Sequence, residues 1–117
     1  MRLTGMVFMA GMAMVASAQT KDPPIVRTYN TYCVQCHGLR RNGTGINRRD
    51  LSVQPRDHTD AKAMGDAPDD ELEKAIREGG LAVNKSVLMP AWGGVLKPEE
   101  ITALVHYLRE VCKCGKK

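Results

Sequence analysis

The chain has 117 residues, a formal net charge of +4 and a hydrophobic content of 43%. This length allows one domain, and so small a net charge gives no support to a nucleic-acid-binding surface. Aromatic residues make up only 4% of the chain, so it can bury only a modest core of its own. Domains of this size often depend on a disulfide or a bound group.

The first eighteen residues have the layout of a secretory signal peptide. Arg2 gives a weak positive start, residues 3–16 are mostly apolar and uncharged, and Ala16-Ser17-Ala18 is a small-x-small cleavage site. An uncleaved anchor is the alternative, but this apolar run is shorter than the roughly 20 residues that a bilayer requires. We therefore expect a cleaved signal peptide at 1–18, an exported or periplasmic domain at 19–117, and no stable membrane span after cleavage.

Three helices are expected in the rest of the chain. Each begins beside a proline, which is tolerated in a first helical turn; these are Pro24, Pro68 and Pro98. Apolar residues then follow helical spacing up to Cys36 in the first helix and Cys112 in the third, whereas Gly79-Gly80 stops the second. No strand-like alternation occurs. The predicted fold class is all-α, with three to four short helices and long loops.

Residues 46–66 are polar, irregular and interrupted by Pro55. Loops of this length in a small domain are usually functional or pack against something other than protein, and wrapping a cofactor would explain this one. Charge is also unevenly spread, because arginines gather in residues 40–56 and acids in residues 57–78. Either the molecule is dipolar and can be oriented by a charged partner, or these charges are ordinary solvated surface.

The strongest motif is Cys33-Val34-Gln35-Cys36-His37, a C-x-x-C-H sequence of the kind that attaches haem covalently. Two thiols at this spacing reach the two vinyl groups on one edge of the porphyrin, and the histidine that follows lies under the iron as an axial ligand. Its Nδ1–H then needs an acceptor, usually a backbone carbonyl.

Three other interpretations of the motif compete with haem attachment. A thioredoxin-like C-x-x-C would need a βαβ setting, and no strand precedes it. A zinc site would need a second ligand pair, which Cys112-x-Cys114 could supply only with a tighter spacing than usual. A structural disulfide would not need His37. The export signal adds to the case for haem.

The second axial ligand must come from elsewhere in the chain, and four residues are candidates. Met89 is favoured, because Pro90 stiffens its loop and glycines 93 and 94 allow close approach to a flat ring. Met64, between charged residues, is a weaker choice. His106 is expected on a helix face, partly solvated, and His58 at the surface of the polar loop.

In the order and spacing of these motifs the chain resembles class I cytochrome c of the bacterial one-haem type. C-x-x-C-H-G ends the first helix, a Gly43-x-Gly45 loop follows, Met89-Pro90-x-Trp92 comes late, and Tyr107 lies in a closing helix. The match covers nearly all of residues 25–111.

The resemblance implies a small cytochrome c fold around one covalently bound haem c, with thioether links to Cys33 and Cys36. It makes His37 the proximal and Met89 the distal iron ligand. The first and last helices cross in this fold, so Tyr29 and Cys33 are expected near Leu104, Tyr107 and Leu108. Many relatives have Gly-Pro after the G-x-G loop, and that proline carbonyl accepts from the proximal histidine. Here Ile46 follows Gly45, so another carbonyl must serve.

Since His/Met ligation leaves no iron position for substrate, the expected function is one-electron transfer between redox partners, by a monomer that is not an enzyme. Three alternatives stay open. The chain could be a haem c subunit docked to a larger oxidase or dehydrogenase. It could be an open-site haem enzyme or sensor if Met89 is not a ligand. It could also be a metal-binding module without haem.

Cys112 and Cys114 lie outside the family pattern, in a short basic tail at 112–117. They could pair with each other or across two chains in an oxidising compartment. An inert tail is slightly favoured, and no disulfide-linked dimer is expected.

Overall fold

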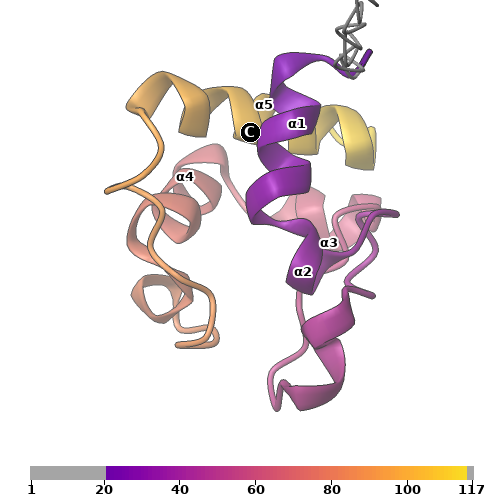
Figure 1. The fold of residues 1–117 in the computed structure, drawn as a ribbon, viewed down its shortest axis with the longest axis vertical. Helices are drawn as coiled ribbons and strands as arrows, with labels where there is room; N and C mark the ends of the chain where they lie inside the picture. Colours follow the sequence, from indigo (N-terminus) through magenta and orange to yellow (C-terminus); the bar gives the residue numbers. More distant parts are fainter. Residues whose placement is uncertain (1–20, 116–117) are drawn as a thin grey trace, which may run out of the picture.

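The computed structural model describes residues 21–115, so the predicted signal peptide at 1–18 and the last two tail residues lie outside the described part. Within these residues the regular structure consists of five α-helices and two 3-10 helices (Figure 1). They are α1 (Pro24–Tyr32), α2 (Val34–His37), η1 (Ile46–Asp50), α3 (Ala61–Asp66), α4 (Asp69–Glu78), η2 (Gly80–Val83) and α5 (Pro98–Cys112). Residues 21–115 contain no strand. The predicted all-α class is confirmed.

The first expected helix is divided in two at Cys33. Its φ of −113° interrupts α1, although its N–H still donates to the Tyr29 carbonyl, and α2 continues to His37. Gly38 then ends α2 with a φ of +80°, a conformation that favours glycine. The apolar face of α1 therefore leads directly into the C-x-x-C-H segment.

The core forms where α1 crosses α5 (Figure 1). The rings of Tyr29 and Tyr107 meet edge to face with centroids 5.5 Å apart. Cys33 packs against the same buried cluster, whose largest fully buried side chains are Tyr29, Met64, Ile101, Leu104 and Val105. The helix crossing that the resemblance implied is present.

The sequence pattern predicted that residues 46–66 are irregular, and the structure corrects this prediction. They contain η1 and the six-residue α3, whose first turn is capped by the Asp60 carboxylate accepting from the N–H groups of Lys62 and Ala63. α3 lies against α5 and buries Met64 completely. Such a short helix has too few turns to show a period in the sequence.

The C-terminal tail is not inert. Cys112 and Cys114 form a disulfide within the chain, and Cys114 lies beside the buried guanidinium of Arg109. Arg109 also donates to Asp69 Oδ1 and to the carbonyl oxygens of Met64 and Ala67. One side chain thus ties α5 to α3 and to the start of α4.

Among the helices that the structure describes, none has the length and apolar character needed to cross a membrane.

Candidate functional site

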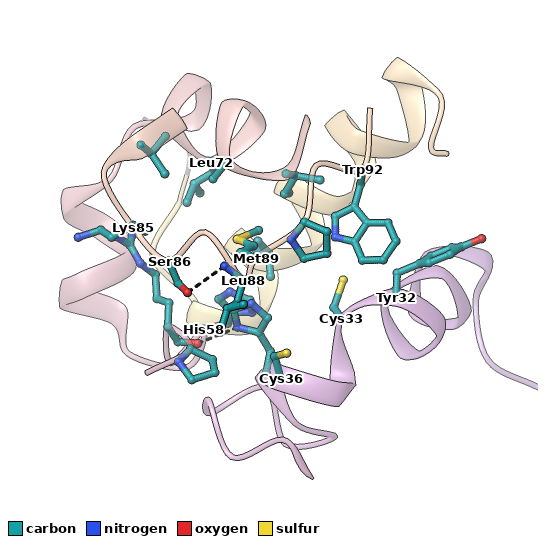
Figure 2. A pocket seen from close by; sticks show the side chains of 18 of the residues that line it. Tyr32, Cys33, Cys36, His58, Leu72, Lys85, Ser86, Leu88, Met89 and Trp92 are labelled. Carbon is teal, nitrogen blue, oxygen red and sulfur yellow. Dashed lines mark hydrogen bonds between the residues drawn. The ribbon is translucent and has the colours of Figure 1, made fainter. Parts of the chain in front are cut away.

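A cavity of about 320 Å³ opens between the C-x-x-C-H segment and the loop that follows η2 (Figure 2). Aliphatic and aromatic side chains from α1, α4, η2, α5 and that loop supply most of its wall: Tyr29, Tyr32, Leu72, Ala75, Ile76, Val83, Leu88, Trp92, Leu104 and Leu108. Residues 51–58 close another side. The cavity is therefore apolar and lies at the centre of the fold, as a buried planar cofactor requires.

Cys33, Cys36 and His37 all line this cavity. The loop after α2 packs against their backbone, since Gly45 N–H donates to the Cys36 carbonyl over 2.9 Å. A Cβ at Gly45 would lie only 2.4 Å from the Cys36 carbonyl carbon, so only glycine fits there. Burial, with a smaller contribution from Cys36, raises the pKa of the Cys33 thiol to about 12. Both cysteines are unpaired in this structure.

The missing acceptor for the proximal histidine is the backbone carbonyl of Arg56. The Nδ1 of His37 lies 3.1 Å from this oxygen, which can only accept, so Nδ1 carries the proton and Nε2 keeps its lone pair. Burial lowers the pKa of His37 and outweighs the opposing effect of this hydrogen bond. The ring is therefore neutral near pH 7, as a metal ligand must be.

Met89 lines the cavity from the loop after η2. Its carbonyl accepts from Gly80 N–H over 3.1 Å, and its own N–H donates to the Ser86 carbonyl over 3.2 Å. A Cβ at Gly80 would lie 2.2 Å from the Ser86 carbonyl oxygen. Two backbone bonds and a glycine-dependent contact thus hold Met89 at the end of α4.

The two glycines after Trp92 were expected to allow close approach of the loop to a flat ring, and the structure does not place them there. Neither Gly93 nor Gly94 lines the cavity. Gly93 instead donates its N–H to the Arg77 carbonyl over 3.0 Å, and a Cβ there would lie 2.9 Å from that oxygen. Its small size serves the contact between this loop and α4.

The other candidate ligands have different positions. Met64 is fully buried and does not line the cavity. His106 is exposed on α5, as expected. His58 is not at the surface, contrary to the prediction: it is 8% exposed and lines the cavity. The polar residues around it gave no sign of this, because its burial comes from contacts with α1 and α2.

Arg56 also contributes its side chain to the cavity wall. Its Nη1 is buried and has no hydrogen-bond partner, and its Nη2 lies 4.0 Å from Glu71 Oε1. A buried cationic donor without a partner at a cavity wall fits an anionic group on a bound molecule.

The other arginines of the predicted cluster divide into two groups. Arg41 turns inward, where it donates to the Tyr107 hydroxyl and to Asn30 Oδ1 and lies over the Tyr29 ring. Arg40, Arg48 and Arg49 are exposed. Only Arg56 reaches the cavity.

These residues fit a covalently bound haem. Two thiols and a neutral imidazole lie on one wall, a thioether lies on a neighbouring loop, and the walls suit an apolar macrocycle. The orphaned Nη1 of Arg56 suits a propionate, since a guanidinium matches carboxylate geometry.

Comparisons with known proteins agree with this site. The family model described as "Cytochrome C oxidase, cbb3-type, subunit III" matches residues 22–108. A solved structure described as "KustC0563 c-type cytochrome" is 28% identical, with a TM-score of 0.60 over 79% of this chain and 96% of that one. No curated protein matches the chain. The chain belongs to this family of one-haem cytochrome c domains and binds haem c covalently.

Proposed function

We propose that the protein is an exported, periplasmic one-electron carrier with a single His/Met-ligated haem c. Cys33 and Cys36 carry the thioether links, His37 is the proximal ligand and Met89 the distal ligand. The observation that carries this proposal is the single apolar cavity wall on which both thiols and the His37 ring converge, with Met89 on a backbone-anchored loop beside it.

Haem with His and Met ligands supplies one-electron chemistry at a raised reduction potential. The chain's own residues hold and tune it. The Arg56 carbonyl fixes the His37 tautomer, the Gly80–Met89 backbone bond holds the thioether loop, and the apolar walls exclude water from the ring face. With both axial positions filled, no place is left for a substrate, which supports electron transfer rather than catalysis.

Apolar side chains around the Met89 loop support docking of a redox partner. Leu81 and Val87, which do not line the cavity, are 68% and 70% exposed and come from η2 and the loop after it. Clustered exposed apolar side chains are typical of interaction sites, and redox encounters use small interfaces. The partner is a redox protein of the same compartment.

The second candidate function is a haem c subunit docked to a larger oxidase. The family description, which names an oxidase subunit, favours it. Co-purification of the full-length chain with membrane oxidase components from its native host would support this function over a free carrier.

Optical spectra of matured protein test the distal ligand. Met89→Leu should remove the weak long-wavelength band of a thioether-ligated ferric haem, because leucine cannot coordinate iron. Met64→Leu is the matched control, since it makes the same change at a buried methionine away from the cavity and should keep the band. A band that persists in Met89→Leu, or a wild-type mass without haem, would contradict the proposal.

A further inference from the structure

His58 lies face to face with the proposed proximal ligand. The rings of His58 and His37 are nearly parallel, at 19°, and their centroids are 4.2 Å apart. His58 comes from the loop between η1 and α3, whereas His37 ends α2. Two segments distant in sequence thus place one imidazole flat against the other.

His58 is itself held firmly. Its Nδ1 and the Tyr29 hydroxyl oxygen are 2.9 Å apart, and its backbone N–H donates to the Arg41 carbonyl over 2.7 Å. Tyr29 is 1% exposed, and its own ring is fixed by the edge contact with Tyr107. Burial raises the pKa of Tyr29 far above its usual value, so the hydroxyl keeps its proton for this bond.

The hydrogen bond from His37 to the Arg56 carbonyl does not by itself fix the rotation of the His37 ring. A carbonyl accepts over a broad range of directions, so this bond alone allows the His37 ring to turn about its Cβ–Cγ bond. A flat side chain packed against one face of the ring blocks that rotation. Outer partners of this kind orient metal-bound histidines and tune the metal.

We propose that His58, held by Tyr29, is a positioning residue that sets the rotational angle of the His37 imidazole plane above the haem. The inference rests on the proposed ligation by His37. It assigns a role to His58, which contacts His37, and to Tyr29, which contacts His58. Neither role requires contact with the iron.

Proton NMR of the ferric, matured protein tests this role, because the hyperfine shifts of the haem methyl groups depend on the angle of the axial imidazole plane. Tyr29→Phe removes one oxygen and should change the spread of the methyl shifts. His58→Ala should change it more, and His58→Phe, which keeps a flat ring, should lie closer to wild type than His58→Ala.

Ile101→Val is the matched control for lost stability, because Ile101 is a buried core residue that does not line the cavity. It should lower the unfolding temperature and leave the methyl shifts in place. Unchanged shifts in both Tyr29→Phe and His58→Ala would overturn the inference. If His58→Ala fails to acquire haem, the methyl shifts of Tyr29→Phe alone decide whether the inference holds. A wild-type protein without covalent haem by mass overturns instead the proposed function.

Discussion

At the scale of single residues, Arg56 serves the site twice. Its backbone carbonyl accepts from His37 Nδ1, and its side chain brings a buried Nη1 without a partner to the cavity wall. A buried cation that lacks a partner is costly. Pairing with a haem propionate would remove that cost and would add a positive charge close to the iron.

Replacing this charge should lower the reduction potential. Arg56→Gln keeps the backbone carbonyl and removes the cation, so the ferric state, which carries one more positive charge, becomes relatively more stable. At an effective dielectric constant suited to partly buried sites, the effect is on the order of 1.4 kcal/mol, or about 59 mV for one electron. Potentiometric titration measures it.

Arg49→Gln is the control for this prediction, because Arg49 is exposed on η1 and its charge is screened by solvent. The reduction potential of Arg49→Gln should therefore stay close to that of the wild-type protein. Equal shifts in the two variants would mean that Arg56 acts only through the overall charge of the molecule.

At the scale of elements, short-range sequence patterns predicted the features that depend on neighbouring residues alone. Proline starts and helical spacing located α1, α4 and α5, and the C-x-x-C-H motif located a segment that lines the central cavity. The contacts that Arg56 and His58 make with His37 could not be predicted, because both depend on how loop 51–58 folds back against α2. α3 was missed because one capping carboxylate, rather than an apolar period, starts it.

Arg109 shows how far one side chain can connect elements. It is 5% exposed and donates to Asp69 Oδ1 at 2.7 Å and to the carbonyl oxygens of Met64 and Ala67 at 2.6 Å each. Its place beside the apolar stripe of the last helix gives no sign of these contacts in the sequence.

Arg109→Met should therefore destabilise the folded protein by about 3 kcal/mol, because it leaves two buried carbonyls and a half-buried carboxylate without their donor. Urea unfolding of the matured protein measures this free energy. Arg77→Met removes a half-exposed arginine that only forms weak ion pairs on α4, and it should cost less than about 1 kcal/mol. Similar losses in both variants would be evidence against the inter-helix role of Arg109.

The Cys112–Cys114 disulfide should be complete in exported protein and confined to one chain. Alkylation under denaturing, non-reducing conditions should label no cysteine, since Cys33 and Cys36 are then thioethers, and reduction should expose two thiols. Because the closed loop is so short, its removal should cost at most about 2 kcal/mol. A disulfide-linked dimer on a non-reducing gel would be the contrary result.

At the scale of the whole molecule, the core is built around the cavity rather than beside it. Helices α1, α4 and α5 all present apolar side chains to that space, including Leu72, Ile76, Leu104 and Leu108. The chain brings only one Trp, three Tyr and one Phe, so the bound haem must supply much of the apolar volume that a domain of this size needs.

The chain should therefore not fold cooperatively without its haem. Without haem, the apolar side chains around this cavity of about 320 Å³ lose the burial and packing that the macrocycle would give them, and the stability of a typical domain is too small to absorb a loss of that kind easily. Cys33→Ala/Cys36→Ala, which cannot attach haem, should show weak near-ultraviolet circular dichroism and no sharp thermal transition. Cys112→Ala/Cys114→Ala makes the same two changes away from the haem-binding motif and should keep both signals in matured protein. A haem-free double variant that unfolds in one sharp step would show instead that helix packing alone specifies the fold.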